Sequence, residues 1–155
     1  MVATSSTHTF TLSDLASTAA LAAHLAATAK PGDCFLLDGP VGVGKTAFAR
    51  AFIQTLIASE EDVPSPTFTL VQMYDAPNFE IWHCDLYRLS SADELVELGL
   101  DEAFGQAVTL IEWPDRLGGL APASAQRLVF EATGQETRRL TVTGDKRWAS
   151  LRAAA

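Results

Sequence analysis

Hydrophobic residues recur along the chain in two patterns, and their alternation predicts a layered α/β protein. Short apolar runs are typical of strands, whereas apolar residues spaced three or four positions apart indicate helices. We predict strands over residues 10–12, 34–38, 67–74, 79–86, 108–112, 126–132 and 138–143. We predict helices over residues 14–28, 45–58, 92–98 and 146–153, with Ser13 as the cap of the first and Ser91 as the cap of the third.

The run at residues 34–38 is apolar almost throughout, which is typical of a central strand covered on both faces. It leads directly into a glycine-rich turn, and the helix that follows carries Phe48, Phe52 and Leu56 at helical spacing. Elsewhere the strands come in pairs separated by short turns, 67–74 with 79–86 and 126–132 with 138–143. These pairs predict two antiparallel β-hairpins.

The glycine-rich turn carries the candidate chemistry. It reads Gly39-Pro40-Val41-Gly42-Val43-Gly44-Lys45-Thr46 and matches the phosphate-loop pattern G-x-x-x-x-G-K-[ST], in the strand-to-helix context that the pattern requires. Glycines allow positive φ angles and close backbone approach, so successive N–H groups can surround a phosphate at the positive end of a helix. We therefore expect bound ATP and Mg²⁺, with Lys45 on the β and γ oxygens and the Thr46 hydroxyl on the metal. The residues expected around the nucleotide phosphates are Gly39, Val41, Gly42, Val43, Gly44, Lys45 and Thr46.

A magnesium ion beside a phosphate loop also needs a carboxylate. Glu112 stands at the carboxyl end of an apolar strand, where ligands collect in open α/β sheets, and Asp85 has a similar position. Each carboxylate alone could instead cap a helix or form a surface ion pair. His83 fits a core position and a site position equally well.

Composition limits the choice of partners and compartment. The chain has 155 residues and a net charge of −8, which opposes unaided binding to nucleic acid. Five of the eleven cationic residues lie near the C-terminus, which is more typical of a solvated face than of a binding site. No apolar run of about 20 residues and no secretory signal is present, and Cys34 and Cys84 lie in apolar runs. We expect one domain over residues 1–155, cytoplasmic and without a membrane partner.

Several sequence blocks together resemble one family. The blocks are residues 39–46 above, then Pro64-Ser65-Pro66-Thr67-Phe68-Thr69-Leu70-Val71, His83-Cys84-Asp85-Leu86-Tyr87-Arg88-Leu89, Glu97-Leu98-Gly99 and Ile111-Glu112-Trp113-Pro114. In this order they resemble the TsaE family, also called YjeE, the ATPase of bacterial threonylcarbamoyladenosine synthesis on tRNA. The chain departs from the family inside the phosphate loop, at Cys84, and in its weak match beyond Pro122.

The resemblance implies a fold, a site and partners. It implies a three-layer α/β fold of the P-loop NTPase type, with a mixed central sheet and added antiparallel strands. It assigns Thr46 and Glu112 to magnesium, makes Thr67 or Thr69 the hydroxyl near the γ-phosphate, and gives Asp85 a role either in orienting water or in supporting the metal. Thr18 matches a threonine near the nucleotide base, while Arg88 and Arg138 are candidate arginines near the site. The implied activity is ATP hydrolysis completed by the TsaD and TsaB proteins, with tRNA reached through those partners.

Three alternatives remain open from the residues. A small P-loop kinase would need an acceptor site and several arginines, and only six cationic residues precede Arg138. A GTP-dependent switch module would need a guanine-reading Asn-Lys-x-Asp motif, which the chain lacks. A phosphate loop without activity could serve as a binding scaffold.

Overall fold

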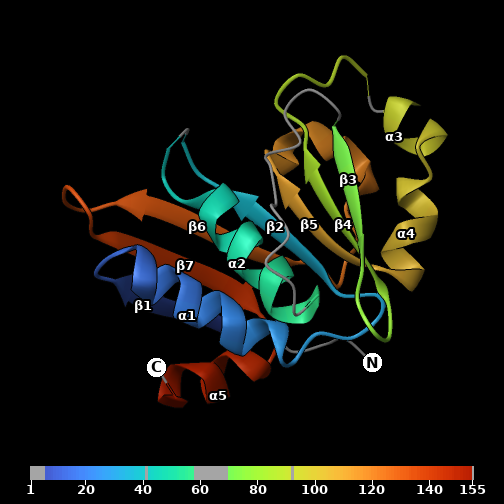
Figure 1. The fold of residues 1–155 in the computed structure, drawn as a ribbon. Coiled ribbons are helices and arrows are strands. Elements are labelled where there is room, and N and C mark those ends of the chain that lie inside the picture. Colours follow the sequence, from blue (N-terminus) through green and yellow to red (C-terminus); the bar gives the residue numbers. More distant parts are fainter. Residues whose placement is uncertain (1–5, 41, 58–69, 92, 155) are drawn as a thin grey trace.

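A computed structural model of the chain describes residues 6–40, 42–57, 70–91 and 93–154 (Figure 1). The strands are β1 (Ser6–Leu12), β2 (Cys34–Asp38), β3 (Val71–Asp75), β4 (Glu80–Asp85), β5 (Val108–Glu112), β6 (Gln126–Ala132) and β7 (Arg138–Gly144). The helices are α1 (Leu15–Ala26), α2 (Lys45–Ile57), α3 (Asp93–Glu97), α4 (Leu100–Gln106) and α5 (Arg147–Ala154), with a 3₁₀ segment η1 (Pro114–Leu120). No helix within these ranges is long and apolar enough to cross a bilayer.

All these strands join one mixed sheet in the order β1-β7-β6-β2-β5-β4-β3. The four central strands β6, β2, β5 and β4 run parallel, whereas β7 and β1 at one side and β3 at the other run antiparallel to their neighbours. Both predicted hairpins are confirmed, as β3–β4 and β6–β7. The mixed sheet with added antiparallel strands is the predicted fold class. The part of the first hairpin predicted over residues 67–69 lies outside the described residues.

Helices cover both faces of the sheet and complete three layers (Figure 1). On one face α1, α2 and α5 enclose a core that includes Phe35 and Leu37 of β2. On the other face α3, α4 and η1 pack with Cys34 and Leu36 of the same strand. Because successive side chains of a strand point to opposite faces, β2 is buried on both sides, as its continuous apolar run predicts.

The first helix begins one residue later than we predicted. Asp14, not Ser13, is the N-cap: its Oδ1 accepts a hydrogen bond of 2.8 Å from the Ser17 backbone N–H. Both residue types can cap a helix, and Asp14 takes the role because its backbone is extended where the helix starts. The short elements α4 and η1 were not predicted. Gly99, expected to end a helix, separates α3 from α4 with a φ of 87°.

An ion pair largely shielded from solvent joins the C-terminal helix α5 to the residue that precedes β2. Arg147 donates to both carboxylate oxygens of Asp33, at 2.7 and 3.0 Å, and also to Asp145. Burial alone would lower the pKa of Arg147, but its bonds to the two carboxylates raise it above its ordinary value. Burial likewise opposes a low pKa at Asp145, but hydrogen bonds from Arg147 hold the pKa of Asp145 below its usual value. This arginine belongs to the basic C-terminal segment, so the interpretation of that segment as a solvated face is wrong at this position.

We expect Arg147→Met to lower the free energy of unfolding by about 2–4 kcal/mol, because the change leaves Asp33 buried without its cation. A carboxyl group with a depressed pKa stabilises the fold above its unfolded pKa and loses that contribution as the pH falls. The Asp145 part of the difference between variant and wild type should therefore shrink below about pH 4. Urea unfolding of both proteins at pH 7 and at pH 3 measures this difference in the free energy of unfolding. Arg139→Met at an exposed position is the control and should change little.

Candidate nucleotide-binding site

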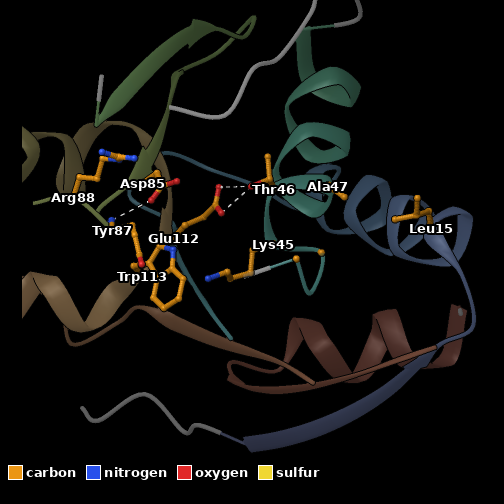
Figure 2. Close-up of a pocket in the computed structure, with 11 residues that line it drawn as sticks. Leu15, Lys45, Thr46, Ala47, Asp85, Tyr87, Arg88, Glu112 and Trp113 are labelled. Atoms are coloured by element: carbon orange, nitrogen blue, oxygen red, sulfur yellow. Dashed lines mark hydrogen bonds between the residues drawn. The ribbon is translucent and has the colours of Figure 1, made fainter. Parts of the chain in front are cut away.

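The phosphate-loop residues meet the predicted carboxylates at one end of the sheet. The loop follows β2, Glu112 ends β5 and Asp85 ends β4, and these strands are parallel neighbours with Leu37 and Asp85 both paired to Glu112. A cavity of about 500 Å³ opens there. Its lining consists of Leu15, Gly42, Gly44, Lys45, Thr46, Ala47, Asp85, Tyr87, Arg88, Glu112 and Trp113 (Figure 2). The structure thus gathers residues from the ends of two strands, the loop after a third strand and two helices, as expected where ligands bind in open α/β sheets.

The loop backbone depends on its glycines. Gly39, Gly42 and Gly44 have φ angles of 140°, 79° and 114°, a region that L side chains rarely adopt. Asp38 Oδ1 accepts the Gly39 N–H at 2.9 Å, and Arg138 Nε donates to the Val43 carbonyl at 3.1 Å. The two ends of the loop are therefore held from outside by β2 and β7. Val41, also expected on the nucleotide, lies outside the described residues.

Gly39→Ala should displace the loop and destabilise the fold. A Cβ at this position would lie 2.7 Å from the Phe130 carbonyl oxygen, in a backbone conformation already unfavourable for alanine. We expect a loss of about 2–3 kcal/mol in the free energy of unfolding, measured by chemical denaturation. Gly105→Ala in helix α4 is the matched control: its Cβ meets no atom within 4 Å, so it should be neutral or stabilising by up to about 1 kcal/mol. If Gly39→Ala and Gly105→Ala changed the free energy of unfolding equally, position 39 would not require glycine.

Lys45 is packed between the loop and an aromatic ring. Its Nζ donates to the Gly39 carbonyl at 2.6 Å and lies 3.5 Å from the centre of the Trp113 ring. Burial lowers the pKa of Lys45, and the charges of Glu112 and Asp85 oppose that shift. A cation over a ring face is favourable by electrostatic attraction. The Lys45 side chain therefore reaches the cavity between the loop backbone and the Trp113 ring.

Trp113 is a site residue to which we assigned no role from the sequence. It follows Glu112 directly and has a φ of 59°, which is uncommon for any residue other than glycine. This turn places its ring over Lys45 and 5.0 Å from the ring of Tyr87. The signal in the sequence was its place between the strand-end carboxylate and Pro114.

Thr46 and Glu112 are in direct contact. The Thr46 hydroxyl donates to the Glu112 carboxylate, at 2.9 Å to Oε1 and 3.1 Å to Oε2 (Figure 2). On its other side, His83 Nε2 lies 2.7 Å from Glu112 Oε2. A hydroxyl beside a carboxylate supplies the oxygen ligands that Mg²⁺ prefers. Among the described residues no group of three or more His, Cys, Asp or Glu could hold a metal ion.

Asp85 lines the same cavity from the end of β4. It is only 5% exposed, and its Oδ1 accepts a hydrogen bond of 3.1 Å from the Tyr87 backbone N–H (Figure 2). Arg88 lines the cavity nearby. Thr67 and Thr69, the candidate hydroxyls near the γ-phosphate, lie outside the described residues.

A second cavity of about 500 Å³ shares the loop residues Gly42 and Gly44 with the first. The start of α1 forms one wall, including Asp14 and Thr18, and the β6–β7 turn forms another, including Glu136 and Arg138. Thr18 is buried and its hydroxyl donates to the Asp14 carbonyl at 3.4 Å. The structure therefore places both Thr18 and Arg138 beside the loop.

Known proteins are similar to this chain in sequence and in fold. A family model described as "Threonylcarbamoyl adenosine biosynthesis protein TsaE" matches residues 12–140. A protein of Rickettsia bellii (strain RML369-C), named tRNA threonylcarbamoyladenosine biosynthesis protein TsaE, is 42% identical over 120 residues, 77% of this chain and 83% of that protein. A Bacillus subtilis (strain 168) protein of the same name is 39% identical over 127 residues, 81% of this chain and 78% of its own. The crystal structure of Bacillus subtilis YdiB superposes with a TM-score of 0.78 at 30% identity, covering 99% of this chain and 96% of that one. The chain therefore belongs to the TsaE family of threonylcarbamoyl adenosine biosynthesis proteins.

Proposed function

We propose that the chain binds Mg-ATP in the loop cavity and hydrolyses it, as the ATPase component of tRNA threonylcarbamoyladenosine modification. One observation carries the proposal: Lys45, Thr46, Asp85 and Glu112 line a single cavity at the phosphate loop. The pathway follows from the family and from the names of its relatives.

Different groups of the chain would bind the phosphates, the metal and the attacking water. Backbone N–H groups of the loop bind phosphate oxygens, and Lys45 exchanges the Gly39 carbonyl for the phosphates it neutralises. Thr46 and Glu112 would hold Mg²⁺, which when bound offsets charge on the β- and γ-phosphates. Asp85 would orient the attacking water or support the metal, and its position in the cavity lining allows either role. The Trp113 ring covers one side of the Lys45 amine, with its centre 3.5 Å from Nζ.

The second cavity suits the nucleoside part of ATP. It adjoins the loop, and Thr18, Asp14 and Glu136 offer polar atoms around it. Two carboxylates there are unsuited to the phosphate chain of a second substrate, and Arg138 already donates to backbone carbonyls. This disfavours a kinase that clamps two phosphate chains.

The partners would be the TsaD and TsaB proteins, with tRNA reached through them. A net charge of −8 gives the chain little affinity of its own for a polyanion. A cation supplied by a partner at the phosphate site can raise the rate of P-loop NTPases by about 10³ to 10⁵.

Labelled-ATP turnover by the chain alone and with TsaD and TsaB tests the proposal. We expect slow hydrolysis alone and a rise of at least about tenfold with the partners. Equal rates would contradict partner activation. GTP should compete weakly, and a phosphorylated small-molecule product would indicate a kinase instead.

A further inference from the structure

His83 is a buried polar residue for which the proposed chemistry gives no use. Its side chain is fully buried, and Nε2 lies 2.7 Å from Glu112 Oε2. The other ring nitrogen, Nδ1, has no hydrogen-bond partner among the described residues. His83 stands two positions before Asp85 on β4, so both side chains leave the sheet on the same face.

The chemistry of the pair determines which nitrogen carries the proton. An ionised carboxylate can only accept, so His83 must donate through an Nε2–H to Glu112. In the neutral ring Nδ1 is then an acceptor, so that no buried N–H lacks a partner at this position. Carboxylates that ligate a metal ion are commonly held by such an outer hydrogen bond.

Glu112 needs such a second anchor. Its side chain has three rotatable bonds, and the Thr46 hydroxyl shares a single hydrogen between the two carboxylate oxygens. One donated hydrogen cannot bind both carboxylate oxygens fully at once, so this contact alone does not determine the orientation of the carboxylate. The bond from His83, on β4, comes from a different element and fixes which oxygen faces the loop.

We propose that His83 is a positioning residue that holds the Glu112 carboxylate in place for the magnesium ion of the nucleotide. The inference rests on the proposed function, because it supposes that Thr46 and Glu112 meet a metal. Loss of such an outer partner typically costs about 10- to 100-fold in metal affinity.

Calorimetric titration of ADP at a series of Mg²⁺ concentrations tests the role. His83→Leu removes the hydrogen-bond donor to Glu112. We expect this change to raise, by about tenfold, the Mg²⁺ concentration at which the metal's effect on ADP affinity is half-maximal. Its ADP affinity in EDTA should equal that of the wild type. His83→Gln carries an N–H near the place of Nε2 and should restore most of the metal dependence. Cys84→Ala, equally buried on the same strand and the opposite face, is the control and should leave the metal dependence unchanged.

A loss of ADP affinity that is equal with and without Mg²⁺ would overturn the proposal, as would an unchanged metal dependence in His83→Leu. If His83→Leu does not fold, NMR of the His83 ring nitrogens in the wild-type protein tests the proposal instead. We expect the Nε2–H tautomer, with a shift of the Nε2 signal in Glu112→Gln; an Nδ1–H tautomer overturns the proposal. This spectrum is recorded without nucleotide. A wild-type chain that shows the Nε2–H tautomer but binds no ADP would therefore refute the proposed function, while the hydrogen bond between His83 and Glu112 would stand.

Discussion

Replacing Lys45 with alanine should weaken ATP and ADP binding by about 100-fold. The change removes the cation that lies at the cavity, and hydrogen bonds to charged groups contribute about 1.5–3 kcal/mol each. It also removes the buried contact with the Gly39 carbonyl and the Trp113 ring, so thermal unfolding must be recorded beside the binding isotherm.

Lys30→Ala is the matched control for this experiment. Lys30 is an exposed lysine just after helix α1, away from both cavities, and its loss should leave nucleotide affinity within about twofold of the wild type. Unchanged binding in a folded Lys45→Ala variant would mean that the phosphates bind elsewhere.

Glu112→Gln should reduce Mg²⁺-dependent hydrolysis on the order of 100-fold or more while nucleotide affinity changes by less than about tenfold. The amide keeps the shape of the side chain but lacks the charge that a magnesium site uses. We prefer it to Glu112→Ala, because alanine would leave the buried His83 without its partner and cost about 1–3 kcal/mol of stability. Single-turnover hydrolysis measures the effect.

Glu131→Gln, an exposed carboxylate on β6, is the control for Glu112→Gln and should hydrolyse ATP like the wild type. If Glu112→Gln kept full turnover, a different carboxylate would have to serve the metal, and Asp85 would be the first to test.

The features that could be predicted from the sequence are those encoded locally. The phosphate loop is a contiguous run of residues whose glycines specify its backbone, and the apolar run of β2 specifies its place in the centre of the sheet. Glu112 and Asp85 could be chosen because each ends an apolar strand, and parallel strands end at the same edge.

The features that could not be predicted depend on contacts between distant segments. The approach of His83 to Glu112 follows from the register of β4 beside β5, and His83 alone fits core and site equally. The place of Trp113 over Lys45 depends on a positive φ at a residue for which that conformation is uncommon. Helix α4 and η1 have seven residues each, too few for a clear periodic pattern.

A crystal structure of the chain with Mg²⁺ and a non-hydrolysable ATP analogue tests the central claim most directly. We predict phosphates bound by backbone N–H groups of the phosphate loop and by Lys45 Nζ, a metal within direct or water-bridged reach of Thr46 and Glu112, and the base beside Thr18. A nucleotide bound elsewhere, or a metal held without either Thr46 or Glu112, would contradict it.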